Sequence, residues 1–251
     1  MTRAGIHRRT KPSLLRRLRV FWVFIVALLA AAAYGGYVLA TWPAFFPKFV
    51  AVTGNVHVSA GAIRRKAAIA GDRNVWLIDK RAAERRVDTL PWIRRTQIHR
   101  SLPAKVEIAV EERVPVACVV SAASQYLVDA SGHVIETACG SELRLAFPPM
   151  PAQAAGAMLN GKLLARMLTD ASVLRSVGLD PVALGFDRYA GLDATLGDGL
   201  RLRLGDDRDV AQKAALVGPI LQAYGARRAE LAAIDLRAPA TPVVELRKPK
   251  K

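Results

Sequence analysis

The longest apolar stretch of the chain lies near its N-terminus, between residues 20 and 40. No charged residue occurs from Val20 to Ala40, and the side chains there are mostly aliphatic or aromatic. At about 1.5 Å per residue, a helix over this stretch is roughly 30 Å long, which matches the thickness of a bilayer core. The pattern therefore predicts a single transmembrane helix over 20–40, followed by a juxtamembrane linker over 41–48.

A cleaved secretory signal peptide is the alternative interpretation, because a basic segment precedes the apolar stretch and small residues lie within it. The stretch is longer than the apolar core of a usual signal peptide, and aromatic residues bracket it, as in a permanent anchor. We therefore favour an uncleaved helix. The basic residues of 1–19 predict that this segment stays in the cytoplasm and that the C-terminal part of the chain lies outside.

Residues 49–113 combine a strand-like period of two with two helix-like segments. Ser59 and Asp79 are expected to cap the helices, and a turn at Leu102, Pro103 and Ala104 joins the last two strands. The order predicts a domain of β-α-α-β-β type with one solvent-facing sheet surface. Its segments are 49–59, 59–70, 79–90, 93–100 and 105–111, and Ser59 ends the first strand and caps the first helix.

A cationic cluster with a tryptophan and a carboxylate pair lies between Thr89 and Ala117. Glu111 and Glu112 point to opposite faces of a strand, so they do not form an acid/base pair. Trp92 follows Pro91 and is expected to pack on the sheet at the end of a helix. We interpret the cluster as a folded surface whose solvent side carries Arg94, Thr96, His99 or Arg100, Lys105, Glu107 and Glu111.

Residues 114–247 are rich in short strands. Strands are predicted at 114–120, 125–129, 133–136, 183–188, 191–196, 200–204 and 243–247, with turns at 121–124 and 130–132. Helices are predicted at about 153–169 and 207–224, and Pro219 is expected to kink or split the second. The pattern predicts a mixed, mainly antiparallel β domain with packed helices over 114–247, and a basic tail over 248–251. The fold class of the chain is therefore α+β.

Cys118 and Cys139 are the two cysteines of the chain. In the predicted hairpins Cys118 lies level with about Val134, several residues short of Cys139. We therefore expect two separate, largely buried thiols rather than a disulfide, although an oxidising compartment would permit a bridge.

The composition and motifs narrow the function. A net charge of +16 suggests a polyanionic partner, but much of it lies in the basic segment before the predicted helix. His57, His99 and His133 are isolated, without metal-ligand or nucleophile spacing. The stretch 156–162 has the spacing of a phosphate loop, yet Leu163 replaces the required hydroxyl residue. We expect no catalysis, no cofactor, no metal and no nucleic-acid partner.

Several motifs occur in an order that resembles the FtsQ/DivIB family of bacterial cell-division proteins. They are VTGNVHVS, LPWIRRTQIHRSLPAKVEIAVEERVPVA, YLVDASGHVI, LRLRLGDDRDVAQKAALVGPIL and IDLR, after a basic segment and one apolar helix. The resemblance implies a POTRA domain over 49–113 and a β domain over 114–247. It also implies a non-enzymatic scaffold at the division septum that binds FtsB/DivIC-like and FtsL-like bitopic proteins, with further division-protein contacts through the POTRA domain.

The resemblance further implies a partner site near the end of the β domain. The arginine of the DLR motif is expected to meet an acidic partner residue, and the last strand is expected to pair edge to edge with a partner strand, as the open edge of a sheet can. The implied site residues are Arg237, Val243, Val244, Glu245, Leu246 and Arg247.

This sequence departs from the family pattern in two ways. Ala238 stands where an aromatic residue is expected, and Pro239 and Pro242 precede the last strand and lack a backbone donor. An internal salt bridge between Arg237 and Asp235 is the alternative role for the arginine. At the level of function, the alternatives are a POTRA-containing export or assembly component of the envelope and a cell-wall enzyme.

Overall fold

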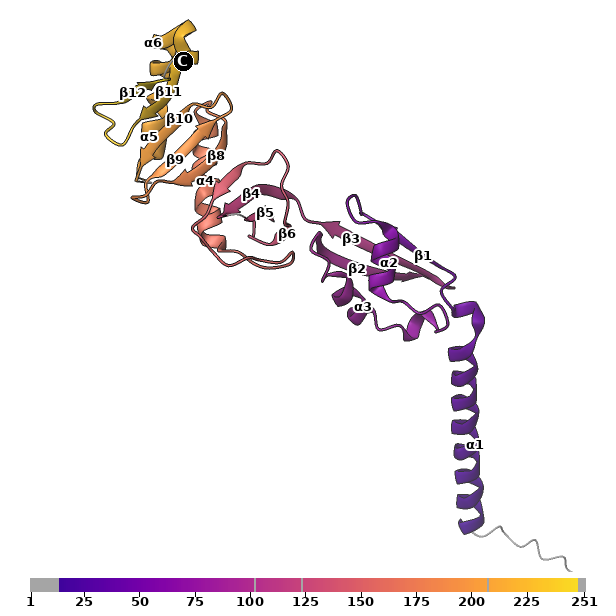
Figure 1. The fold of residues 1–251 in the computed structure, drawn as a ribbon. Helices are drawn as coiled ribbons and strands as arrows, with labels where there is room; N and C mark the ends of the chain where they lie inside the picture. Colours follow the sequence, from indigo (N-terminus) through magenta and orange to yellow (C-terminus); the bar gives the residue numbers. More distant parts are fainter. Residues whose placement is uncertain (1–13, 102, 123, 207, 248–251) are drawn as a thin grey trace, which may run out of the picture. The chain divides into compact units, whose positions relative to one another are not determined.

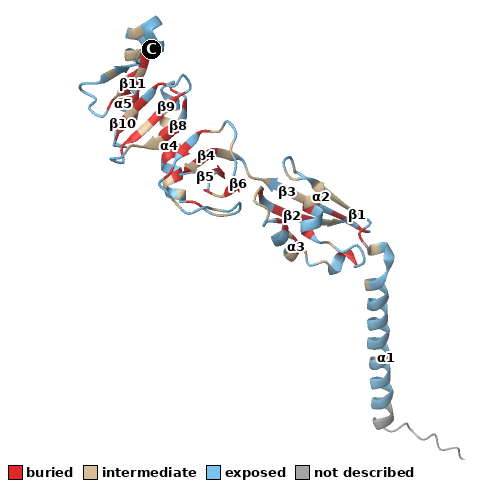
Figure 2. Ribbon diagram, in the orientation of Figure 1, coloured by how far each residue is buried: buried red, intermediate tan, exposed pale blue. Residues whose placement is uncertain are grey.

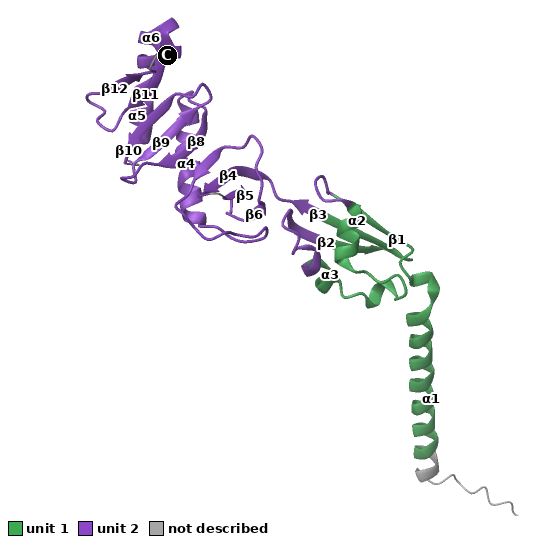
Figure 3. Ribbon diagram, in the orientation of Figure 1, with its two compact units in different colours: residues 1–53, 60–84, 97–109 green, residues 54–59, 85–96, 110–251 purple. Residues whose placement is uncertain are grey.

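The computed structural model describes residues 14–101, 103–122, 124–206 and 208–247. Most of the predicted basic segment, the tail over 248–251, Leu102, Ala123 and the predicted helix start at Asp207 lie outside this part. The chain forms two compact units (Figure 3). One comprises 1–53, 60–84 and 97–109, and the other comprises 54–59, 85–96 and 110–251.

The N-terminal helix α1 (Leu14–Thr41) contains the predicted apolar stretch and begins before it (Figure 1). The segment from Leu18 to Thr41 is long enough and apolar enough to cross a membrane, by length and composition. The hydroxyl of Thr41 donates to the Tyr37 carbonyl at 2.8 Å, and Pro43 opens the short 3-10 helix η1 (Pro43–Phe45) that follows. The helix therefore ends at the start of the aromatic segment.

A three-stranded sheet with the order β1-β3-β2 follows α1. The elements along the chain are β1 (Phe49–Thr53), α2 (Ala60–Ala67), η2 (Val75–Leu77), α3 (Lys80–Val87), β2 (Ile93–Ser101) and β3 (Lys105–Glu112). β1 runs parallel to β3, with Val50 beside Val106 and Val52 beside Ile108. The predicted β-α-α-β-β order is confirmed, and Asp79 caps α3 by accepting from the N–H of Ala82 at 3.0 Å.

The charged surface of β2 and β3 is predicted correctly with one exception. The exposed side chains of Arg94 and Glu111 form an ion pair at 3.0 Å. Thr96, expected on the solvent side, is buried, because two exposed residues in succession, Arg94 and Arg95, shift the alternation of β2. Thr96 and Ile98 then lie on the buried side.

A nine-stranded mixed sheet fills most of the larger unit, with the order β12-β11-β10-β9-β8-β7-β4-β5-β6. The pairs β10/β11, β4/β7 and β7/β8 are parallel and the others antiparallel, as the mixed, mainly antiparallel prediction requires. Its strands are β4 (Pro115–Ser121), β5 (Ser124–Asp129), β6 (Val134–Glu136), β7 (Arg144–Ala146), β8 (Pro181–Phe186), β9 (Leu192–Leu196), β10 (Arg201–Gly205), β11 (Leu231–Asp235) and β12 (Val243–Leu246).

Helices pack on this sheet and bury its apolar side (Figure 2). They are α4 (Gly161–Ser176), α5 (Val210–Ala215) and α6 (Val217–Tyr224), followed by η3 (Gly225–Glu230). The helix α4 starts later than predicted, where Asn160 caps it by accepting from the N–H of Leu163. The break between α5 and α6 at Leu216 is the predicted split, since Pro219 cannot donate to the carbonyl four residues earlier.

The expectation of two free thiols is wrong, because Cys118 and Cys139 form a disulfide with a Cα–Cα distance of 5.8 Å. The sequence pattern did not predict β7. This strand returns beside β4, on the side away from β5, and the N–H of Cys118 donates to the Leu143 carbonyl at 2.8 Å. The loop before β7 therefore brings Cys139 back to Cys118.

Candidate partner-binding edge

The strand β12 is the terminal strand of the nine-stranded sheet. It pairs antiparallel with β11, with Asp235 beside Val243 and Ile234 beside Val244. Within the described part of the chain, the strand order leaves the other edge of β12 without a strand neighbour. The unpaired N–H and C=O groups of such an edge can pair with the backbone of another chain.

The two sides of β12 differ. Val244 is partly buried against the core of the sheet. Val243 and Glu245 lie on the opposite face, since successive strand residues alternate, and both are exposed. Leu246 is exposed although it shares the side of Val244. The strand therefore offers both apolar side chains and a carboxylate beside its free edge.

Arg247, the last predicted site residue, anchors the strand. Its Nε donates to the Leu231 carbonyl and its Nη2 to the Asp198 carbonyl, both at 2.9 Å. Its backbone N–H donates to the Glu230 carbonyl at 2.7 Å. These contacts fix the end of β12 to β11 and to the turn between β9 and β10.

Arg237 lies beyond β11, at the start of the loop that leads to β12. Its Nε donates to both carboxylate oxygens of Asp235 at 3.0 Å, and its backbone N–H donates to the same carboxylate at 3.1 Å. The alternative role from the sequence, an ion pair with Asp235, is therefore what the structure contains. The Arg237 side chain is still 48% exposed, so a carboxylate from outside can reach it.

Two further charged residues join this pair. Arg203 on β10 binds Glu245 on β12 through both terminal nitrogens, one of them at 3.2 Å, and lies 4.0 Å from Asp235. Arg203 on β10 thus links the carboxylates of Asp235 on β11 and Glu245 on β12, next to the free edge. Arg203 was not among the predicted site residues, although the alternation of LRLRLG puts it on the polar side of its strand.

The pKa shifts in this cluster follow from its contacts. The hydrogen bond from Arg237 lowers the pKa of Asp235, against the effect of burial, and Arg203 contributes to the same shift. Bonding to Glu245 raises the pKa of Arg203. On β9, burial and the nearby Asp187 raise the pKa of Asp193, although Arg203 and Arg237 oppose the shift. The carboxylate of Asp235 therefore stays ionised at neutral pH.

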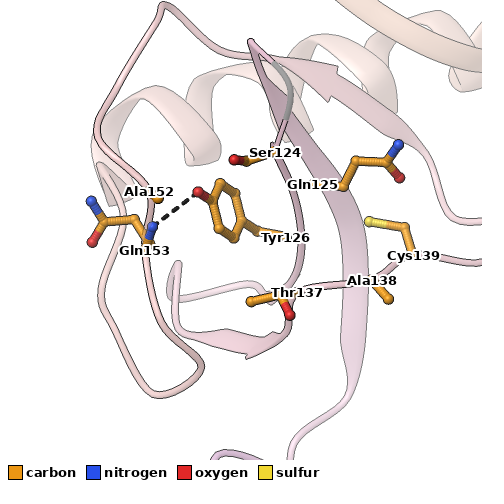
Figure 4. Close-up of a pocket in the computed structure, with 8 residues that line it drawn as sticks. All are labelled: Ser124, Gln125, Tyr126, Thr137, Ala138, Cys139, Ala152 and Gln153. Atoms are coloured by element: carbon orange, nitrogen blue, oxygen red, sulfur yellow. Dashed lines mark hydrogen bonds between the residues drawn. The ribbon is translucent and has the colours of Figure 1, made fainter.

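A cavity of about 580 Å³ lies beside the disulfide, where the Tyr126 hydroxyl accepts from the Gln153 N–H at 2.9 Å (Figure 4). Its lining holds no carboxylate, imidazole or amine. It consists of Ser124, Gln125, Tyr126, Thr137, Ala138, Cys139, Ala152 and Gln153. Within the described ranges, no group of three or more His, Cys, Asp or Glu could hold a metal.

Comparison with known families decides the relationship of the chain. Residues 47–113 match the POTRA domain, FtsQ-type, and residues 117–237 match the C-terminal domain of cell division protein FtsQ/DivIB. Together the two matches cover about three quarters of the chain. The chain belongs to the FtsQ/DivIB family. The predicted family and the α+β fold are thereby confirmed, and the three-stranded sheet with α2 and α3 is the POTRA part.

Individual relatives agree with this assignment. Cell division protein FtsQ of Myxococcus fulvus is 33% identical over 104 residues, which are 40% of this chain and 36% of the relative. FtsQ of Syntrophotalea carbinolica is 28% identical over 53% of this chain and 47% of its own. Cell division protein DivIB of Bacillus subtilis is 32% identical over 34% of this chain and 33% of its own. In each case the match spans less than half of the relative's own length.

Proposed function

We propose that this chain is a non-enzymatic scaffold of the division machinery that links early and late division proteins at the septum. It binds FtsB/DivIC-like and FtsL-like bitopic partners by strand addition at β12. The observation that carries the proposal is the position of β12 at the end of the sheet order, with one edge unpaired among the described residues and Arg237 exposed nearby. Membership of a cell-division family supports the cellular role.

The exposed guanidinium of Arg237 favours an acidic residue on the partner. Arg237 and Arg203 each already hold a carboxylate of this chain, but the Arg237 side chain is still 48% exposed and can donate to a second carboxylate. A partner carboxylate would therefore share or replace Asp235 at Arg237, while the partner backbone pairs with β12. Division proteins that contact the POTRA part would then use a different surface.

We further propose that the chain is a single-pass protein of the inner membrane, with its N-terminus in the cytoplasm and both folded domains outside. The apolar helix α1 supplies the anchor, and the basic residues before it favour this orientation. The Cys118–Cys139 disulfide supports it independently, because such bonds persist in oxidising compartments outside the cytosol.

Binding of the full chain to a purified FtsB/FtsL-type partner tests the proposed site. Arg237→Glu replaces attraction with repulsion, and Val244→Pro removes a donor and the shape of the edge. Both are expected to weaken binding at least about tenfold. Arg175→Glu is the matched control, because Arg175 is 50% exposed and paired with Asp180 in the same unit.

Unchanged affinity in both site variants, with melting behaviour like that of the control, would remove β12 and Arg237 from the interface. The cellular role is tested separately with a fluorescent fusion of the full chain. A band at midcell supports the division role. An even distribution over the cell surface would favour the export alternative, and turnover of purified peptidoglycan would favour an enzyme.

A further inference from the structure

The turn Asn74–Leu77 is tied to the end of the apolar helix. The side-chain Nδ2 of the buried Asn74 donates to the carbonyl of Leu39, in the last turn of α1, at 3.1 Å. Its Oδ1 accepts from the N–H of Trp76 at 2.9 Å. The preceding Gly71 is close to the segment between η1 and β1, since a Cβ there would lie 3.8 Å from the Pro47 carbonyl.

The position of Leu39 along α1 determines the depth at which this turn lies relative to a bilayer. The apolar helix from Leu18 to Thr41 has 24 residues, a length of about 36 Å against a hydrocarbon core of roughly 30 Å. The carbonyl of Leu39 lies near the end of that span, so it falls where the hydrocarbon gives way to headgroups. The aromatic residues Trp42, Phe45 and Phe46 follow directly, as in a membrane-interface belt.

The turn presents apolar side chains at this level instead of burying them. Val75 is fully buried, but Trp76 is 49% and Leu77 65% exposed. Arg100 holds the turn in place. Its guanidinium lies 5.3 Å from the centre of the Trp76 ring, and its Nη1 donates to the carbonyls of Val75 and Trp76 at 3.3 and 3.2 Å. The exposure of Trp76 and Leu77 is therefore a fixed feature of the fold.

We propose that Trp76 and Leu77 insert into the headgroup boundary of the same phospholipid bilayer that α1 spans. Tryptophan is favoured at this depth because its ring is apolar while its N–H remains hydrated. The exposed basic side chains of Arg73, directly before the turn, and Lys48, directly before β1, then face lipid phosphates. The POTRA part thus contacts the membrane at a second point besides the helix. This inference rests on the membrane anchoring contained in the proposed function.

Depth-dependent quenching of tryptophan fluorescence tests the contact in the full chain. The sequence has four tryptophans, so single-tryptophan variants are made by changing the other three to phenylalanine. The variants retaining only Trp76 or only Trp22 are reconstituted into phosphatidylethanolamine/phosphatidylglycerol vesicles with bromines at shallow or deep acyl positions. We expect a loss of Trp76 emission of roughly twofold or more, largest with the shallow bromines.

A negative charge at position 77 tests whether the quenching of Trp76 requires insertion of the turn into lipid or only its proximity to the bilayer. In the Trp76-only chain, Leu77→Asp is expected to abolish most of the quenching, because a carboxylate resists entry into the apolar layer. Val114→Asp is the matched control, since Val114 is also an exposed aliphatic residue. It should leave the quenching unchanged.

The outcomes distinguish this contact from the anchor itself. Quenching of Trp22 without quenching of Trp76 overturns the contact but retains the anchor. Absence of quenching at both residues overturns the anchor and with it the contact. A Trp76 emission that is blue-shifted yet insensitive to brominated lipid means that protein covers the turn, and this also overturns the proposal.

Discussion

Glu112 binds His57 at two points, with the backbone N–H and the imidazole Nδ1 of His57 each 2.9 Å from the same carboxylate oxygen. The other oxygen accepts from the N–H groups of Val56 and Val58, both at 2.9 Å. His57 in turn stacks on Trp92 at a ring separation of 4.0 Å, and Trp92 donates to Glu136 at 2.7 Å. One nearly buried carboxylate thus organises the loop after β1.

Neutralising Glu112 is expected to destabilise the fold. Burial opposes its ionisation, but the backbone bonds and His57 lower its pKa from 4.5 to about 2. The pKa of Glu112 is lower in the folded state than in the unfolded state. The stabilisation of the fold by its carboxylate is therefore complete above pH 4.5 and is lost as the pH falls through about 2. At pH 7, Glu112→Gln should lower the free energy of unfolding by about 1–3 kcal/mol.

Urea unfolding of the full chain in detergent micelles between pH 2 and 7 measures this effect. The variant should also lose part of the acid dependence seen in the parent chain. Glu111→Gln is the control, because the exposed pair of Glu111 with Arg94 contributes at most about 1 kcal/mol. Equal effects of the two substitutions would contradict the organising role of Glu112.

Removing the disulfide is expected to weaken the larger unit without altering the partner edge. Replacing both Cys118 and Cys139 with alanine should cost about 2–4 kcal/mol of unfolding free energy, because the bridge closes a loop with a sequence separation of 21. A reducing agent should destabilise the parent chain similarly and leave the double variant unchanged. A parent chain indifferent to reduction would show that the bond does not form.

Asp235→Asn is expected to strengthen partner binding if Arg237 meets a partner carboxylate. The amide can still accept from the Arg237 N–H, which Asp235 binds at 3.1 Å, but the competing charge is gone. An exposed ion pair of this kind corresponds to roughly a twofold to fivefold change in affinity. Titration at low and high salt measures it, and the gain should shrink as salt increases. Weaker binding would instead assign Asp235 the role of ordering the loop.

Gly205→Ala is expected to disturb the packing around Arg237. Gly205 has a φ of +72°, and an added Cβ would lie 2.9 Å from Cγ of Arg237. The left-handed backbone alone costs about 1–2 kcal/mol for alanine, and Arg237 must also move. We expect a lower melting temperature and weaker partner binding. Gly197→Ala is the control, since its nearest neighbour is a Val182 methyl at 3.8 Å. Similar losses in both variants would exclude a specific effect on Arg237.

Local patterns predicted most of the elements because their physical causes are local. The uncharged stretch of α1, the alternation of β3 and the Asp79 cap each depend on residues close in sequence. The split at Leu216 likewise follows from Pro219. The family motifs added the expectation of a partner edge at 243–247, and the strand order agrees with an unpaired edge there.

The features that the sequence did not predict depend on contacts between distant segments. The three-residue strand β7 is too short to show a period, and without it Cys139 could not be placed beside Cys118. Similarly, Arg203 reaches Glu245 only because β10 and β11 pair in parallel after a helical crossover. Thr96 is buried because β2 departs from strict alternation at Arg94 and Arg95. No turn-forming residue in this stretch of the sequence marks the departure.

The parallel pairing of β10 with β11 also has a consequence for the newly made protein. The hairpin β9–β10 closes over a short turn, whereas β11 reaches β10 only after α5, α6 and η3 have been laid down. Distant pairings are slower to form than neighbouring ones, so the proposed partner edge at β12 is completed late. A molecule in which β11 and β12 have not yet paired would expose the edge of β10 instead.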